Sequence, residues 1–412
     1  MRTKIFTLVW LLASVTVAVA QRHEIMSSRI GALQVMAGDR WTDMPVASLG
    51  ETIHIDFDDL THDYTRYTYK IEHCEADWTP SEELFSSDYL QGFAEGNVID
   101  NYEISEGTYM LYTHYSLNIP NDLCRLTMSG NYRLTVMDEN AGDVPVFTVC
   151  FMIVEPTMGV SLEWTDNTDA DIRGRHQQIE MQLSYGNVAV TNPLEQIKTV
   201  VLQNGRWDNA RHNARPQYVM NDGLRWQHCR EYIFDGGNEY RKFEMLDLTH
   251  PTMGIDHISW DGEHYHVYVF PDEPRPNYIY DEDANSAFLI RNSDYTDINT
   301  TCDYALVHFR MVSPERLDGD VYLNGAWTND RLLPEYRLEY DDGEHVYETT
   351  LWLKQGYYNY QYLLVDAQGA FHPVPSEGNF YQTENSYQAL VYYRSDGDRA
   401  DRLVAYASIT TE

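Results

Sequence analysis

Basic residues are scarce in this chain of 412 residues. Lys and Arg number 29 against 64 Asp and Glu, so the formal net charge is −35. A protein this acidic is repelled by nucleic-acid phosphates and by anionic lipid headgroups. The composition therefore argues against nucleic acid as a partner more strongly than against any other class. The simplest interpretation of the charge is that it keeps the protein in solution.

Cysteine is also rare, and the spacing of the five cysteines matches no metal-binding or redox motif. Cys74, Cys124, Cys150, Cys229 and Cys302 include no Cys-x-x-Cys pair, which argues against a zinc ribbon and a thioredoxin-like site. An odd number leaves at least one thiol outside any disulfide in a monomer. We expect buried thiols, while the sequence leaves the pairing open.

Motifs of common enzymes and metal sites are absent. The chain has no Gly-x-Ser-x-Gly, no His-Glu-x-x-His and no P-loop. Asp281–Asn292 opens like a calcium loop, but Ser286 replaces the turn glycine and Asn292 replaces the final glutamate. His264 and His266 share a strand face, yet the spacing places no third ligand beside them. We predict no catalytic residue, no metal site, no cofactor and no enzymatic activity.

Long apolar runs are missing beyond the N-terminus. Arg2 and Lys4 precede the apolar run Ile5–Val19, and Ala18–Ala20 has the small-x-small pattern of a signal peptidase site. The run is shorter than the roughly 20 residues of a spanning helix, and no cysteine follows it for lipid attachment. We expect a cleaved signal peptide at residues 1–20 and an exported mature protein that does not span the membrane.

Aromatic and branched residues are abundant instead. Hydrophobic residues make up 43% of the chain, and it contains 32 Tyr and 9 Trp, a composition that favours extended structure. Alternation of apolar and polar residues predicts strands. The main predicted strands are Thr52–Phe57, Tyr64–Glu72, Thr108–Ile119, Asn131–Met137, Val144–Val154, Gln178–Tyr185, Glu195–Gln203, Tyr240–Leu246, His264–Phe270 and Asp303–Val312.

Turn-rich segments between these strands, without helical periodicity, indicate sandwiches. Glu155–Pro156 is a plausible first linker, and the polar stretch Arg291–Thr301 a second. The predicted fold is all-β, with three consecutive immunoglobulin-like or β-sandwich domains after the signal peptide. Their predicted bounds are 21–156, 157–299 and 300–412, the last resembling an early-set immunoglobulin-like domain.

The stretch Leu351–Leu364 has the pattern of a half-buried hairpin. Leu351 and Leu353 alternate with polar or exposed neighbours, and tyrosines follow with the same period after Gln355–Gly356. Glycine accepts the positive φ of a tight turn. We therefore expect the two arms to pair with each other.

The same stretch belongs to an ordered series of motifs that runs from about Ile30 to the C-terminus. The other members are His73–Trp78, Ser129–Tyr132, Gln203–Asn209, Gly237–Arg241 and Glu377–Phe380. In this order they closely resemble the Bacteroidota family of type IX secretion system plug proteins.

The resemblance implies a function that the residues alone do not. Proteins of this family bind the periplasmic side of the β-barrel translocon of the type IX secretion system in the outer membrane. They are thought to seal its channel while no substrate is engaged. The resemblance therefore implies a periplasmic protein that lies peripherally at the inner face of the outer membrane. We expect it to be monomeric by itself.

Two of the motifs contain candidate contact residues. Arg206, Trp207 and Asp208 follow a predicted strand, and Glu239 and Arg241 face the same way two residues apart. One interpretation is that they order turns through side-chain hydrogen bonds. The other is a patch that contacts a protein partner, since Trp and Arg dominate interface energetics. The turn-ordering interpretation is the stronger.

A carbohydrate-binding role is the alternative function. Asp320–Trp327, together with Leu351–Leu364, resembles early-set immunoglobulin-type domains related to glycogen-binding modules. Such modules stack sugars on exposed aromatic rings, for which Trp327 or Trp352 could serve. Aromatic residues in a sandwich are more often core residues, and burial of both would rule this function out.

Overall fold

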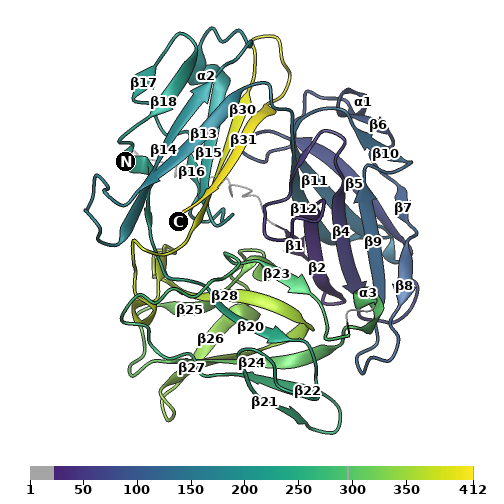
Figure 1. The fold of residues 1–412 in the computed structure, drawn as a ribbon. Helices are drawn as coiled ribbons and strands as arrows, with labels where there is room; N and C mark the ends of the chain where they lie inside the picture. Colours follow the sequence, from purple (N-terminus) through teal and green to yellow (C-terminus); the bar gives the residue numbers. More distant parts are fainter. Residues whose placement is uncertain (1–22, 295–296, 412) are drawn as a thin grey trace, which may run out of the picture.

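The computed structural model describes residues 23–294 and 297–411, and these are organised almost entirely as β-strands. The prediction of an all-β protein is confirmed. The predicted signal peptide at residues 1–20 lies outside the described residues. Within those residues, no helix has both the length and the apolar character needed to cross a membrane. The sheets form three groups, which we call the first sandwich, the second sandwich and the large sheet (Figure 1).

The first sandwich consists of two main sheets and lies on the right in Figure 1. One has the order β1-β12-β11-β5-β7 with β3 on β12, the other β2-β4-β9-β8, and β6 pairs with β10. Its elements are β1 (Glu24–Ile25), β2 (Ile30–Ala37), β3 (Val46–Ser48), β4 (Ile53–Asp59), β5 (Tyr67–Cys74), α1 (Ser86–Tyr89), β6 (Leu90–Gly92), β7 (Asn97–Ile99), β8 (Tyr102–Ile104), β9 (Thr113–Ile119), β10 (Cys124–Leu126), β11 (Gly130–Asp138), the 3-10 turn η1 (Glu139–Ala141) and β12 (Val144–Val154).

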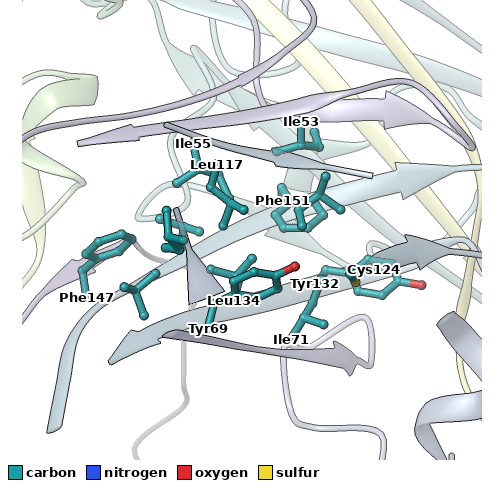
Figure 2. Close-up of a cluster of buried hydrophobic side chains, with 14 of the residues drawn as sticks. Ile53, Ile55, Tyr69, Ile71, Leu117, Cys124, Tyr132, Leu134, Phe147 and Phe151 are labelled. Carbon is teal, nitrogen blue, oxygen red and sulfur yellow. The ribbon is translucent and has the colours of Figure 1, made fainter. Parts of the chain in front are cut away.

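Alternation along the strands produces the core of this sandwich. On β11, Tyr132 and Leu134 are two residues apart and both fully buried. They face Ile55 and Leu117 of the opposite sheet (Figure 2). Each apolar side chain buried in this way contributes about 1.5–3 kcal/mol, so the alternating pattern is the main source of stability.

The second sandwich combines strands from the middle and the end of the chain. One sheet has the order β13-β14-β18-β17 with β19 on β14, and the other β16-β15-β30-β31. In Figure 1 the yellow β30 and β31 lie among teal strands. Its elements are β13 (Gly159–Thr165), β14 (His176–Ser184), α2 (Pro193–Gln196), β15 (Ile197–Gln203), β16 (Arg211–His212), β17 (Tyr218–Val219), β18 (Gly223–Trp226), η2 (Arg230–Tyr232), β19 (Ile233–Asp235), β30 (Ser386–Tyr393) and β31 (Arg402–Thr410).

The large sheet has the order β20-β28-β25-β26-β27-β24-β22-β21, with β23 and β29 on β28. It encloses a core of its own that includes Phe243, Phe309 and Tyr360. Its elements are β20 (Arg241–Met245), β21 (Ile255–Trp260), β22 (Tyr265–Val269), β23 (Phe288–Ile290), α3 (Ile298–Thr301), β24 (Tyr304–Val312), β25 (Asp320–Asn324), η3 (Ala326–Thr328), η4 (Pro334–Tyr336), β26 (Arg337–Asp341), β27 (Val346–Lys354), β28 (Gly356–Val365), β29 (Phe371–Pro373) and η5 (Pro375–Glu377).

The sheets do not follow the predicted bounds 157–299 and 300–412. β20 lies before residue 299 and pairs with β28, which lies after it. β30 lies after residue 299 and pairs with β15 over seven residues. Alternation of apolar and polar residues identifies a strand but not the strand with which it pairs. A domain boundary at residue 299 therefore separates strands that pair with each other and groups strands that belong to different sheets. By strand pairing, the large sheet is inserted between β19 and β30 of the second sandwich.

The expected hairpin around Gly356 is also wrong. β27 pairs with β24 and β26, whereas β28 pairs with β20, β23, β25 and β29. Gly356 does not have a positive φ. A Cβ atom there would come within 2.5 Å of the carbonyl oxygen of Leu289, so glycine allows the close approach of β23 rather than a hairpin turn.

Two junctions connect the first sandwich to the other two groups. An apolar cluster joins the first and second sandwiches and includes Trp78, Met152, Leu202 and Trp207. Between the first sandwich and the large sheet, Lys354 Nζ lies 2.6 Å from Asp58 Oδ2, with side chains that are 2% and 0% exposed. Both junctions are fully buried, so the groups form one interlocked body.

Candidate functional site

The motifs that carried the family resemblance meet at the junctions. At the junction between the first and second sandwiches, the Trp78 and Trp207 rings pack edge to face with centroids 5.7 Å apart. The Tyr392 hydroxyl donates to Asn131 Oδ1 at 2.9 Å. Three motifs that are distant in sequence therefore lie together: His73–Trp78, Ser129–Tyr132 and Gln203–Asn209.

Two further motifs, Gly237–Arg241 and Glu377–Phe380, are joined between the second sandwich and the large sheet. The Phe380 N–H donates to the Gly237 carbonyl at 2.8 Å, and the Gly237 N–H to Asn379 Oδ1 at 2.9 Å. Arg241 Nη2 lies 2.8 Å from Glu377 Oε1. The series of motifs thus describes how the parts of the fold are connected.

Arg206 and Asp208 form a local pair at the end of β15. Arg206 Nε donates to Asp208 Oδ1 at 3.0 Å, and Nη2 donates to Oδ2 at 2.5 Å. Burial opposes the charge on the guanidinium, yet the adjacent carboxylate raises the pKa of Arg206 above its usual value. This geometry agrees with a residue pair that orders the turn.

A polar cavity of about 420 Å³ lies beside this pair. Its wall includes Arg206, Asp208, Arg211, Asn238 and Tyr240, from loops of the second sandwich and the start of the large sheet. The Arg211 guanidinium lies 4.7 Å from the centroid of the Phe234 ring. The predicted residues Arg206 and Asp208 therefore line a concave surface, although their charges are directed at each other.

Arg241 is at the centre of a buried ionic network. Its Nη1 lies 2.7 Å from Asp272 Oδ1, and its Nε donates to Glu377 Oε1 at 3.0 Å. Arg275 contacts the other oxygen of Glu377 through Nε at 2.9 Å. The hydroxyl of Tyr362 donates to Asp272 at 2.5 Å. This network ties the start of β20 to η5, the turn that precedes β30.

Glu239 does not face Arg241 in a surface patch. Its side chain is buried, and Oε1 accepts from the Tyr278 hydroxyl at 2.5 Å and from the Glu384 N–H at 3.1 Å. Burial raises the pKa of Glu239. Nearby, burial also raises the pKa of Asp283 to about 7, and the charge of Glu239 adds to that shift.

The two tryptophans proposed for sugar stacking differ in exposure. Trp327 is 8% exposed, and its Nε1 donates to the Asn359 carbonyl at 2.9 Å. It belongs to the core of the large sheet, so it offers no ring face to a sugar and that part of the prediction is corrected. Trp352 is 39% exposed and packs edge to face on His264 at 4.9 Å.

The other candidate groups are placed as follows. All five cysteines are buried thiols. His266 Nδ1 lies 2.9 Å from His308 Nε2, and His266 Nε2 lies 3.0 Å from Asp261 Oδ2. In the part of the chain that the structure describes, no group of three or more His, Cys, Asp or Glu side chains is placed to hold a metal ion.

Sequence reasoning missed the long-range partners. Asp272 and Arg275 lie in a loop without strand periodicity, where alternation carries no signal. Glu377 could have been found, because it opens one of the quoted motifs. Lys354 follows the apolar position Leu353 in the alternating pattern, where a lysine is expected to face solvent, whereas it is buried against Asp58.

Comparison with known proteins agrees with this arrangement. Residues 30–155 match the family model of the type 9 secretion system plug protein 1st domain. A crystal structure of a hypothetical protein from Parabacteroides merdae is 38% identical and superposes with a TM-score of 0.92. The match covers 95% of this chain and all of that one. A search of curated proteins found no match. The chain therefore belongs to the type 9 secretion system plug protein family.

Proposed function

We propose that this protein binds the periplasmic side of the outer-membrane translocon of the type IX secretion system and seals its channel when no substrate is engaged. The family match of the first sandwich carries the proposal. In this role the protein is exported by residues 1–20, lies at the inner face of the outer membrane and acts without catalysis or a cofactor.

The interlocked body suits a seal. Strand pairing between β15 and β30, the apolar cluster around Trp78 and Trp207, and the Asp58–Lys354 pair connect the three groups of sheets. A body whose parts are already ordered loses little conformational entropy when it docks. Such a body can cover a wide opening without reorganising.

The candidate residues act in this proposal by holding the body together. Arg206, Trp207, Asp208, Glu239 and Arg241 are engaged with other residues of this chain. We infer that they order turns and junctions, and that the partner is contacted by more exposed groups.

The test compares cells with and without the gene for this protein. If the protein seals the channel, its deletion leaves an open pore, so sensitivity to antibiotics that the outer membrane normally excludes increases. The translocon purified from wild-type cells carries the protein with it. Complementation with the wild-type gene restores the permeability barrier and serves as the control.

Absence of the protein from the purified translocon, together with an unchanged permeability barrier, would overturn the proposal. The exposed ring of Trp352 favours a second candidate, an exported carbohydrate-binding protein. Oligosaccharide binding by the pure protein that is lost in Trp352→Ala, with folding intact, would favour this second function over the plug.

A further inference from the structure

Three aromatic side chains, two exposed and one half-buried, meet where the first sandwich contacts the large sheet. Tyr109 lies in the loop before β9, Trp260 ends β21 and Tyr265 begins β22. The ring centroids are 5.1 Å apart for Tyr109 and Trp260, 4.9 Å for Tyr109 and Tyr265, and 4.7 Å for Trp260 and Tyr265. Tyr109 is 65% exposed and Trp260 is 44% exposed. We call these three residues the aromatic cluster.

The cluster is held in place by the fold. The Asp303 carboxylate accepts from the Tyr109 N–H at 2.5 Å and from the Met110 N–H at 3.0 Å. Tyr265 is hydrogen-bonded to Tyr109, which with burial raises the pKa of Tyr265 to about 12. An ordered cluster loses little side-chain entropy on binding.

Two more apolar side chains are exposed on the segments that adjoin the cluster. They are Leu111 and Ile298, whose segments are joined by the hydrogen bond from the Glu106 N–H to the Thr300 carbonyl. Single exposed apolar residues are common on any protein, but a contiguous group formed by distant segments is typical of an interaction site. Trp and Tyr are also the residues that contribute most at protein interfaces.

The Asp, Glu, Lys and Arg residues of the segments that form the cluster all carry charge of one sign. The segments that converge here, residues 102–112, 246–269 and 297–303, contain eight Asp and Glu and no Lys or Arg. The negative charges of Asp303 and Asp247 also raise the pKa of the Tyr265 hydroxyl. The cluster is therefore an aromatic surface within a negative field, which is complementary to a positively charged partner.

We propose that the aromatic cluster is the docking site for a basic segment of the translocon, one that presents Arg side chains to Tyr109 and Trp260. This rests on the proposed function. A guanidinium stacks on the faces of Trp and Tyr rings, while the surrounding carboxylates attract it over longer distances and speed association. Sequence reasoning had directed attention to buried residues such as Arg206 and Arg241 instead.

The experiment purifies the tagged translocon from cells that carry single variants of this protein. For Tyr109→Ala and Trp260→Ala we expect at least a tenfold loss of co-purified protein. For Glu263→Lys, on the exposed turn between β21 and β22, we expect a several-fold loss. Ile172→Ala and Glu344→Lys are matched controls at exposed positions of β-rich surface elsewhere, and they should bind as the wild type does. Thermal unfolding of each purified variant checks that it is folded.

The outcomes separate the two proposals. If wild-type protein is retained and all variants are retained equally, the docking site is wrong and the plug function stands. If wild-type protein is not retained and the permeability barrier is unchanged without it, both are overturned. If the pure protein instead binds an oligosaccharide and Trp260→Ala abolishes that binding, the cluster is a sugar site and the docking proposal fails.

Discussion

At the scale of single residues, the most demanding interaction is the buried pair between Asp58 and Lys354. Asp58 Oδ2 also accepts from the Tyr304 hydroxyl at 2.6 Å, and the Lys354 ammonium lies 4.0 Å from the centroid of the Tyr112 ring. Asp58 Oδ1 lies 2.8 Å from His114 Nδ1. Both carboxylate oxygens and the ammonium therefore have polar partners, which is the condition under which a buried ion pair is tolerated.

Without Lys354, the buried Asp58 carboxylate keeps only the Tyr304 hydroxyl and the His114 ring as partners. We expect Lys354→Met to lower the free energy of unfolding by about 3–5 kcal/mol, measured by chemical denaturation. Lys70→Met, which breaks an exposed pair with Glu72, should cost less than about 1 kcal/mol. Adding Asp58→Asn to Lys354→Met should recover part of the loss; a double variant that is less stable than the single one would contradict this account.

Asp283 makes stability depend on pH. Its pKa is raised to about 7 in the folded protein, mainly by burial, whereas an unfolded Asp titrates near 4. The folded state therefore binds the extra proton between these values, and stability is lost as pH rises through about 7. Between pH 5 and pH 8, the free energy of unfolding should fall by about 1–3 kcal/mol more in the wild type than in Asp283→Asn.

Thermal unfolding across this pH range measures the difference. Glu282→Gln, at an exposed neighbouring position, should follow the wild type. Equal pH dependence of Asp283→Asn and the wild type would show that Asp283 is ionised normally in the fold.

Only some of these side-chain interactions could be predicted from the neighbouring sequence. The Arg206–Asp208 pair could be expected, because the two residues are separated by one position. The partners of Arg241 and Lys354 lie 136 and 296 positions away. Nothing in one segment indicates a partner at such a distance, so these buried networks emerge only from the tertiary structure.

At the scale of elements, alternation located the strands well. The predicted strand Val144–Val154 coincides with β12, and Asn131–Met137 falls within β11. Thr108–Ile119 was too long, since β9 begins at Thr113 and the preceding residues form the loop that presents Tyr109. Partners were not predictable, because the alternating pattern of β28 would fit any neighbour with an apolar inner face.

The pairing of β15 with β30 has a direct consequence for stability. Ending the chain after Asn385 removes β30 and β31, two of the four strands in one sheet of the second sandwich. It uncovers buried side chains including Val201 and Leu202. We expect the second sandwich to unfold, while the first sandwich, whose sheets lie within residues 24–154, keeps its fold.

Limited proteolysis with mass spectrometry of the fragments can test this. The truncated chain should yield a resistant fragment near residues 24–154, and the full chain should resist throughout. A truncated chain that resists cleavage within residues 159–235 would contradict the proposed dependence on the last two strands.

At the scale of the whole molecule, polarity is distributed unevenly. Buried networks use Arg206, Arg241, Arg275 and Lys354, a notable share of the few basic side chains available. Yet among the described residues that are buried, eight are Asp or Glu and Lys354 is the one Lys or Arg. The acidic excess that gives the net charge of −35 therefore extends from the surface into the interior.

The insertion of the large sheet between β19 and β30 also sets an order of events during chain synthesis. β15 ends at residue 203, and its partner β30 begins at residue 386. The first sandwich can fold as soon as its own residues have emerged. The second must wait, with an exposed edge at β15, until almost the entire chain is available. During that interval the β15 edge is open to pairing with other chains, so the newly made protein is most vulnerable to aggregation just before its last two strands arrive.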